Sequence, residues 1–436
     1  MSVARSFFSL SSLTLVSRVS GFIKVAAFAA FYGRSAEADM FLAVMILPDL
    51  LYRFLSEGLV SSASVPLFVD LRNDKEQLEK ALFTISWIAL LVSGIFAIFL
   101  SFNAEDFCRL LTPGFDQNHL ERMKFLWALM SVYLVTGTVA GVFTSFLNAQ
   151  NYFALPAIGP LLVNIAIIAA IFIVRGGAVE KIALAVIIGS VMQLIWLIYL
   201  TWKYGYLADA QRHFKEFDVK IAVSFVRSVF PVAAWISVLP FIPVYERYLL
   251  SMQPVGSVAA LNYIEKLFNL PLGILSISLA RVILPELSRL GGADRRRFLF
   301  KMIGMSTLVI LPVVVFSVVC AESIVEIVFK RGRFSVEDTV AAAGLFASYS
   351  FALLPTTLCM IFNRGFFAAR KYHVPFLAGL SAAAAQFYLG RPMVEKYGVN
   401  GIGYAAAIAF SVQLLVLFFA EIKTSVAQRD TNDVSA

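Results

Sequence analysis

The sequence predicts an all-α polytopic membrane protein with about twelve transmembrane helices, because of its composition and its long apolar runs. Of the 436 residues, 60% are hydrophobic and 15% are charged, whereas a soluble domain has roughly 45–50% apolar and about 25% charged residues. Apolar runs of about 20 residues can cross a bilayer as helices and are too long for the strands of an outer-membrane barrel. The composition excludes a soluble enzyme, a disordered protein and a nucleic-acid-binding module.

Twelve apolar segments are expected to span the membrane. Several exceed the roughly 20 residues that a bilayer requires, so we expect tilted or kinked helices. Prolines inside spans free a carbonyl group and can kink the helix, and they stand at Pro48, Pro231, Pro240, Pro243 and Pro271. In chain order the predicted spans are 7–32, 39–69, 79–102, 121–149, 152–174, 180–202, 218–250, 257–287, 301–327, 336–366, 373–394 and 398–422.

The distribution of basic residues predicts that both termini are cytoplasmic. The chain has 36 Lys and Arg residues against 28 Asp and Glu residues, a net charge of +8. With the N-terminus inside, 18 basic residues lie in cytoplasmic segments and 11 on the opposite side, in agreement with the positive-inside rule. The Arg triplet at 295–297 either sets this topology or binds anionic lipid head groups.

The spans divide into six and six at a polar stretch over 203–220. Spans 2 and 8 each carry a basic residue and a later proline, and parallel halves are a common plan of transporters. We therefore expect an N-terminal lobe over 1–205, a C-terminal lobe over 206–427 and a polar cytoplasmic tail over 428–436.

Seven basic residues fall inside the predicted spans: Arg18, Lys24, Arg53, Arg227, Arg247, Lys266 and Arg281. Arg or Lys at a helix centre costs about 2.5–3.5 kcal/mol in a membrane, so four would cost on the order of 10–14 kcal/mol. That equals the whole stability of a typical protein, roughly 5–15 kcal/mol. The side chains must therefore meet partners or a water-filled cavity. Arg227, Arg247 and Arg281 lie near span ends or beside acids, and we interpret them as structural.

The remaining cations are candidates for function, each with a structural alternative. Lys24 can snorkel to the membrane interface, and Arg53 can pair with Glu57 at i,i+4. Lys266 directly follows Glu265, and adjacent helix residues do not face each other, so these two make a poor ion pair. Arg18 has no acidic residue within helical reach, which makes its functional interpretation the strongest.

A cluster of buried cations predicts an anionic, phosphorylated substrate, because Arg binds phosphate through two hydrogen bonds and Lys acts as a point charge. Among the acidic residues, Asp39 opens a span, where a carboxylate also favours the helix N-terminus. Glu246 is the better candidate for coupling to a proton or cation. No metal-ligand spacing, nucleophile motif or phosphate-binding glycine loop occurs, so we expect no enzyme activity, metal or cofactor.

Short motifs in spans 1, 2 and 8 carry a resemblance. Ser17-Arg18-Val19-Ser20-Gly21-Phe22 is similar to SRVLGF, and Leu47-Pro48-Asp49-Leu50-Leu51-Tyr52-Arg53 with Ser56-Glu57-Gly58 is similar to LPNLLRR and AEG. Ala260-Leu261-Asn262-Tyr263 and Arg331-Gly332-Arg333-Phe334 follow in the same order. Over roughly residues 1–375 the chain resembles the MviN/MurJ family, the lipid II flippases of bacterial cell-wall synthesis.

The resemblance implies the multidrug/oligosaccharidyl-lipid/polysaccharide exporter fold, in which two six-helix lobes surround a central cavity and work by alternating access. It implies that basic residues of the cavity hold a lipid-linked diphosphate. The residues of this sequence that match the substrate-binding motifs are Arg18, Lys24, Arg53, Lys266, Ser17, Glu57 and Asp39.

Three features depart from the family pattern. Lys24 and Lys266 stand where the family has Arg, and Tyr52 replaces one Arg of a pair. These changes keep most of the charge but weaken bidentate capture of phosphate. The family has fourteen spans, of which the last two help to form a groove for the lipid tail, whereas about twelve are expected here.

The hypothesis is therefore a flippase that carries lipid II from the inner to the outer leaflet of the bacterial cytoplasmic membrane. Two alternatives stay open: an exporter of another polyprenyl-linked oligosaccharide, and a non-transporting membrane scaffold for cell-wall synthesis. Coupling to the membrane potential or to a monovalent cation is open as well. We expect a monomer in contact with membrane lipids, with cell-wall synthesis enzymes as candidate partners and no nucleic acid.

Overall fold

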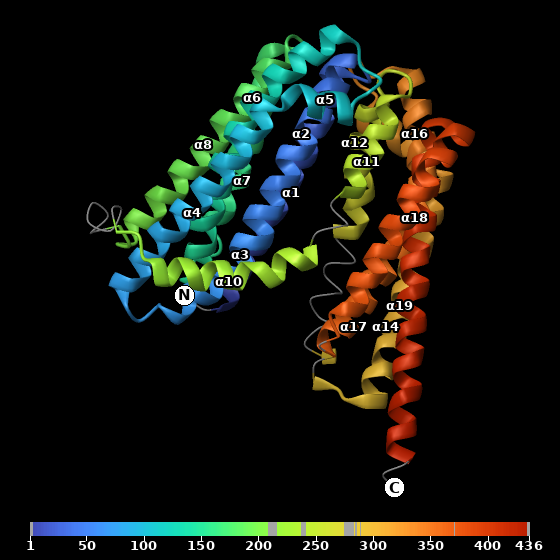
Figure 1. Ribbon diagram of the computed structural model, residues 1–436. Helices are drawn as coiled ribbons and strands as arrows, with labels where there is room; N and C mark the ends of the chain where they lie inside the picture. The colour runs from blue at the N-terminus through green and yellow to red at the C-terminus, as the bar shows by residue number, and fades with distance from the viewer. Residues whose placement is uncertain are drawn as a thin grey trace. The chain divides into compact units, whose positions relative to one another are not determined.

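The computed structural model describes residues 3–207, 216–236, 241–273, 283, 286–287, 289–369 and 371–433 (Figure 1). Its regular elements are all helices, which confirms the predicted fold class. Seven helical stretches in this part of the chain are long and apolar enough to cross a membrane: Lys75–Phe102, Gln117–Ala149, Pro156–Val174, Val179–Lys203, Asp294–Val319, Val336–Ala368 and His373–Lys423.

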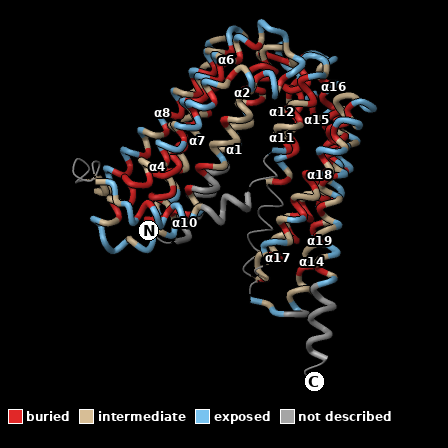
Figure 2. Tube along the Cα trace, in the orientation of Figure 1, coloured by how far each residue is buried: buried red, intermediate tan, exposed pale blue. Residues whose placement is uncertain are grey.

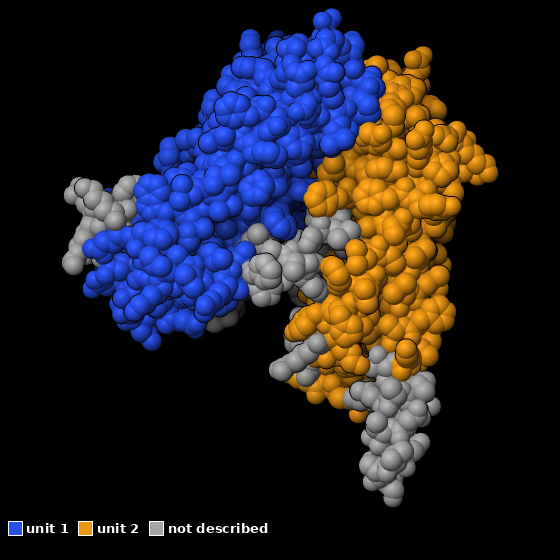
Figure 3. Space-filling model, in the orientation of Figure 1, with its two compact units in different colours: residues 1–237 blue, residues 238–436 orange. Residues whose placement is uncertain are grey.

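The chain folds into two compact units, unit 1 over residues 1–237 and unit 2 over residues 238–436 (Figure 3). The predicted lobe boundary at 205/206 and the predicted cavity between lobes stay predictions. The last helix is regular as far as Asp433, so the segment predicted as a polar tail is helical over 428–433.

Unit 1 is built around one long helix, α6 (Gln117–Ala149), which packs against α2, α4 and α8. Its buried cluster includes Phe68, Leu82, Phe146 and Leu197. The other elements of unit 1 are α1 (Val3–Tyr32), α2 (Ala36–Tyr52), η1 (Arg53–Val60), α3 (Ser61–Asp70), α4 (Lys75–Phe102), α5 (Ala104–Leu111), η2 (Pro156–Ile158), α7 (Gly159–Val174), α8 (Val179–Lys203) and α10 (Val219–Ile236).

Unit 2 is organised around its last helix, α19 (Gly401–Asp433), which packs against α16, α17 and α18. Its buried cluster includes Leu299, Ile361, Phe362 and Phe366. The other elements are α11 (Ile242–Ser251), α12 (Ser257–Pro271), α14 (Gly292–Val319), α15 (Ala321–Phe329), α16 (Val336–Ser350), α17 (Leu353–Ala368), α18 (His373–Tyr397) and η5 (Gly398–Asn400).

The long helices bury one face and expose another that is also apolar (Figure 2). Ile173 on α7, Leu308 on α14 and Val319 at the end of α14 are each more than three-quarters exposed. Continuous apolar surface of this kind is rare on soluble monomers and is the surface that lipid covers. The protein is a multi-span membrane protein.

The segment predicted as one span over 218–250 is described in two parts. The described residues of this segment form two helices, α10 in unit 1 and α11 in unit 2, and residues 237–240 between them lie outside the described part, so a single span stays a prediction. Helix α10 is amphipathic: Ile221 and Phe225 are buried while Lys220 and Arg227 are exposed. Pro243 is the second residue of α11, in the first turn, where its missing N–H costs no intrahelical hydrogen bond; Pro240 lies outside the described residues.

Candidate functional site

The first helix carries two of the predicted site cations. Arg18 is exposed and Lys24 half-buried, six residues further along α1, which is about 120° around the helix. The stretch that carries Arg18 is fixed to α7, because the amide of Asn164 donates to the Ser17 carbonyl (3.3 Å) and to the Ser20 hydroxyl (3.0 Å). Ser17, predicted as a substrate contact, thus has its carbonyl engaged in holding α1 in place.

Arg53 lies at the start of η1, a π-helical turn between α2 and α3. Its Nε lies 3.1 Å from Oδ2 of Asp49, yet its side chain stays 61% exposed. The sequence-based alternative paired Arg53 with Glu57, whose side chain lies outside the described residues. The Asp49 partner was missed, although its i,i+4 spacing to Arg53 is readable in the sequence.

The segment from Tyr52 to Ser56, which includes the start of the π-helical turn, packs closely against two glycines of α6. A Cβ atom added to Gly141 would lie 1.9 Å from the Ser56 hydroxyl, and one added to Gly137 would lie 2.7 Å from the Tyr52 ring. Tyr52 also packs against the Tyr133 ring, with 5.5 Å between ring centroids. Only the absence of side chains at both glycines lets η1 approach α6 this closely. π-Helical insertions of this kind are frequent at functional sites.

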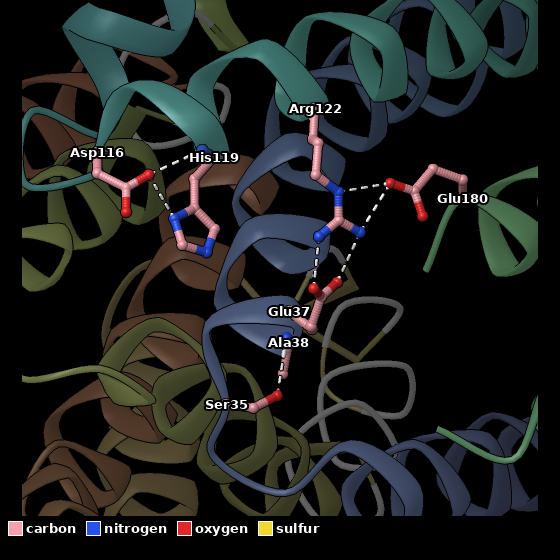
Figure 4. A network of polar contacts seen from close by, with 7 residues as sticks. All are labelled: Ser35, Glu37, Ala38, Asp116, His119, Arg122 and Glu180. Carbon is pink, nitrogen blue, oxygen red and sulfur yellow. Dashed lines mark hydrogen bonds and ion pairs between the residues drawn. The ribbon is translucent and has the colours of Figure 1, made fainter. Parts of the chain in front are cut away.

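A second charged group joins three helices of unit 1 (Figure 4). Arg122 of α6 donates from Nη2 to Glu37 of α2 (2.8 Å), with a second bond from Nη1, and from Nε to Glu180 of α8 (2.8 Å). Arg122 therefore makes a bidentate contact with one helix and a further contact with another, and so holds the ends of α2, α6 and α8 together.

Asp39 lies two residues beyond Glu37 and is 3% exposed. It belongs to the first turn of α2, which is capped by the Ser35 hydroxyl accepting from the Ala38 N–H (3.2 Å). A carboxylate at this position is stabilised by the helix N-terminus.

At the start of α6, hydrogen bonds from the His119 backbone and ring lower the pKa of the Asp116 carboxyl.

In unit 2, Glu246 of α11 is fully buried. Its carboxylate accepts hydrogen bonds from the Gln386 amide of α18 (2.9 Å) and from the Tyr349 hydroxyl of α16 (3.3 Å). The side-chain carbonyl oxygen of Gln386 is buried and has no hydrogen-bond partner among the residues that the structure describes. Three helices therefore meet at one carboxylate.

Arg247, the next residue after Glu246, forms an ion pair with a different helix. Arg247, 3% exposed, donates two hydrogen bonds to Glu265 of α12, one of them 2.9 Å long, and a third to the Pro243 carbonyl. This pair joins α11 to α12 and agrees with the structural interpretation of Arg247. Lys266 is half-buried on α12.

The predicted site residues thus fall into two groups. Arg18, Lys24, Arg53 and Asp39 belong to unit 1, and Lys266 and Glu246 to unit 2. Their convergence on one substrate remains a prediction. Within the described part of the chain, no group of three or more His, Cys, Asp or Glu side chains is arranged to hold a metal ion.

A sequence profile described as "Lipid II flippase MurJ" matches residues 28–431, which is most of the chain and includes both units. The chain belongs to the lipid II flippase MurJ family. That family consists of transporters rather than enzymes.

Relatives named as probable lipid II flippase MurJ match along nearly the whole chain. The protein of Buchnera aphidicola subsp. Baizongia pistaciae is 24% identical over 433 residues, covering 96% of this chain and 83% of that protein. The Vibrio cholerae protein is 25% identical, with 94% and 81% covered. The Rhizobium meliloti protein is 26% identical, with 96% and 80% covered.

Solved structures agree with the fold. A lipid II flippase MurJ in an inward closed conformation superposes with a TM-score of 0.83 at 24% identity, covering 94% of this chain and 87% of that one. An inward-facing multidrug transporter of the MATE family, in the MOP superfamily, gives a TM-score of 0.80 at 12% identity, with 97% and 99% covered. The predicted exporter fold is confirmed.

Proposed function

We propose that this MurJ-family chain flips lipid II, an undecaprenyl-diphosphate-linked disaccharide peptide, from the inner to the outer leaflet of the bacterial cytoplasmic membrane. The observation that carries the proposal is the family match over residues 28–431. A second support is chemical. A diphosphate that enters an apolar protein must exchange its hydration for other donors, and mid-span Arg and Lys side chains supply them.

Arg18 and Arg53 are the primary diphosphate ligands in this proposal. Both guanidinium groups come from exposed side chains on helices whose backbones are fixed, α1 by Asn164 and η1 by the glycines of α6. Arg53 can change partners from Asp49 to phosphate, because exposed i,i+4 pairs contribute only about 0.3–0.5 kcal/mol. Lys24 and Lys266 add point charges for the rest of the head group.

Because Tyr52 replaces one Arg of the family's pair, this chain has one guanidinium group fewer to bind the diphosphate. Its ring is held between Gly137 and Tyr133, so it fills space against α6 and adds no charge. The diphosphate is then held by two guanidinium forks and two ammonium groups. Looser binding of this kind lets the head group leave when the lobes rock open to the outside.

Glu246 is proposed to couple transport to an ion. Its carboxylate joins α11, α16 and α18, so binding of a proton or a monovalent cation there changes the forces between three helices at once. The buried side-chain carbonyl oxygen of Gln386 offers such an ion a second oxygen.

Membrane placement follows from the same proposal. The chain would lie in the cytoplasmic membrane with both termini inside, in keeping with 18 basic residues on that side against 11 on the other. It would work as a monomer and receive lipid II from the enzymes of cell-wall synthesis.

The decisive experiment measures lipid II in each leaflet of bacterial cells that are depleted of their own flippase and express this chain. The wild-type chain is expected to restore lipid II to the outer leaflet. Arg18→Ala is expected to reduce transport at least tenfold at equal membrane abundance, because one lost charge-assisted contact costs about 1.5–3 kcal/mol. The matched control is Arg175→Ala, an exposed arginine at the end of α7, which should transport normally.

Two results would contradict the proposal in different ways. Failure of the wild-type chain to move lipid II would reject the function and favour another polyprenyl-linked glycan as cargo. Full transport by Arg18→Ala would keep the function and reject the site.

A further inference from the structure

Helix α10 does not run alongside the spanning helices of unit 1 but lies across their ends (Figure 1). It packs against α3, α4 and η1. Two contacts fix its beginning: the Asp218 N–H donates to the Thr84 hydroxyl (3.2 Å), and Glu216 pairs with Lys80 (3.4 Å). The Asp218 carboxylate caps the helix by accepting from the Lys220 and Ile221 N–H groups.

The two faces of α10 differ sharply. Ile221 and Phe225, at most 8% exposed, belong to the buried cluster that also contains Phe68 and Leu82. The opposite face is exposed and carries both valines and basic residues. Its members are Val219, Lys220, Val223, Ser224, Val226, Arg227 and Ser228.

The exposed face is hollowed over about 520 Å³, along a surface formed by Val219, Lys220, Val223, Ser224, Arg227 and Ser228. Lys220 and Arg227 are seven residues apart, so they point the same way about 10 Å apart along the axis, with Ser224 between them. Among the residues that the structure describes, neither cation has an ion-pair partner. Lys80, Lys124 and Arg122 in the same unit are all paired.

The end of unit 1 where α10 lies is the side that the charge distribution assigns to the cytoplasm. The helix crosses the first turns of α4, which begins at Lys75, and contacts α3, which ends at Asp70. Arg72, Lys75 and Lys80 belong to the cytoplasmic group of basic residues. A helix with apolar and basic residues on one surface at this level matches the chemistry of the lipid interface, and the cytoplasmic leaflet is the anionic one.

We propose that the exposed face of α10 is a binding site for an anionic phospholipid of the cytoplasmic leaflet. Lys220 and Arg227 hold the phosphate, the Ser224 hydroxyl donates between them, and Val219 and Val223 contact the first methylene groups of the acyl chain. The occupant is a membrane lipid because the hollow places apolar and cationic side chains next to each other, which a free phosphate would not use. This site is independent of the lipid II site.

A site-resolved cross-linking experiment tests the proposal. The full chain, with the photoreactive residue p-benzoylphenylalanine at position 223, is reconstituted in vesicles of phosphatidylglycerol and phosphatidylcholine at 1:4. After illumination, mass spectrometry identifies the captured lipid. We expect the ratio of captured phosphatidylglycerol to captured phosphatidylcholine to exceed the bulk ratio about tenfold to thirtyfold, because each basic residue near an anionic head group contributes roughly a factor of five.

Three variants of this labelled chain make the result specific. Lys220→Gln/Arg227→Gln should return the captured lipid to the bulk ratio, whereas Lys220→Arg/Arg227→Lys should retain the enrichment. The control Arg175→Gln/Lys181→Gln removes the same charge from exposed residues where α7 ends and α8 begins, and it should behave as the parent chain does. A single gel-filtration peak for each variant establishes folding.

The proposal is overturned if the parent chain captures the two lipids in their bulk ratio, or captures no lipid. It is also overturned if enrichment survives in the folded Lys220→Gln/Arg227→Gln variant. None of these readouts depends on lipid II transport, so failure of the proposed function would leave the test intact.

Discussion

At the scale of single residues, the arginines of this protein differ in whether they join two helices and in how far they are exposed. Arg122 and Arg247 each make bidentate bonds to a glutamate on another helix. The pair of Arg247 with Glu265 is largely buried, and removing one partner of a buried pair costs about 3–5 kcal/mol, because the other charge is left behind. Arg18 and Arg53 are exposed. The difference separates structural arginines from candidates for substrate contact.

Glu246→Gln is expected to keep the fold and remove ion coupling. Glutamine has nearly the same shape and can still accept a hydrogen bond from Gln386 or Tyr349, but it carries no charge. In vesicles containing the purified chain, an imposed proton or sodium gradient should accelerate lipid II transport by the wild type several-fold and leave the variant unaffected. Glu395→Gln, 64% exposed on α18, is the matched control and should respond as the wild type does. Gradient-driven acceleration in Glu246→Gln would exclude this carboxylate from coupling.

At the scale of elements, glycine spacing decides where the backbone of span 2 can lie. Gly137 and Gly141 stand one helical turn apart on α6, and both face the segment from Tyr52 to Ser56. Small residues at this spacing let membrane helices approach closely. The approach fixes the π-helical turn and with it the position of Arg53.

Gly141→Ala is expected to impair the protein, because its Cβ would lie 1.9 Å from the Ser56 hydroxyl and 3.2 Å from the Ser56 Cα. Forced overpacking of this kind typically costs about 1–3 kcal/mol. Thermal unfolding in detergent should show a lower melting temperature, and lipid II transport should fall with it. Gly94→Ala, which meets no atom within 4 Å, should match the wild type. Adding Ser56→Gly to Gly141→Ala should restore part of the loss; a double variant no better than the single one would reject the contact as the cause.

At the scale of the whole molecule, each spanning helix carries the chain from one aqueous side of the membrane to the other. Loops that follow α4, α6, α7 and α8 in turn therefore lie on alternate sides. The turn after α3 and the turn between α7 and α8 then face opposite sides. Asn73 and Ala178 are exposed residues in these two turns. Of the three native cysteines, Cys108 and Cys359 are buried and Cys320 is half-buried.

Intact cells expressing Ala178→Cys should react with a membrane-impermeant maleimide, whereas Asn73→Cys should react only after the cells are permeabilised. The reason is the excess of basic residues on the side of Asn73. Labelling is read from the shift of the protein band on a gel, with the unsubstituted chain as background. Labelling of Asn73→Cys alone in intact cells would invert the proposed topology.

The sequence by itself determined the features that local chemistry controls. Spans at 79–102, 121–149 and 180–202 lie within α4, α6 and α8, because about 20 apolar residues in a row have no other low-energy state in lipid than a helix. The family was readable from the motifs around Arg18 and Arg53, because those residues carry a chemistry that the bilayer makes costly.

Tertiary structure alone decided which charges meet and where an amphipathic segment goes. Arg122 joins Glu37 and Glu180 across 85 and 58 residues, a distance along the chain over which helical periodicity carries no information. The same holds for Arg247 with Glu265 and for Glu246 with Gln386. Helix α10 was apolar enough to be predicted as part of a span, and its packing on α3 and α4 could not be read from the sequence. Periodicity reports which side of a helix is apolar, whereas the partner that covers that side is set by packing between helices.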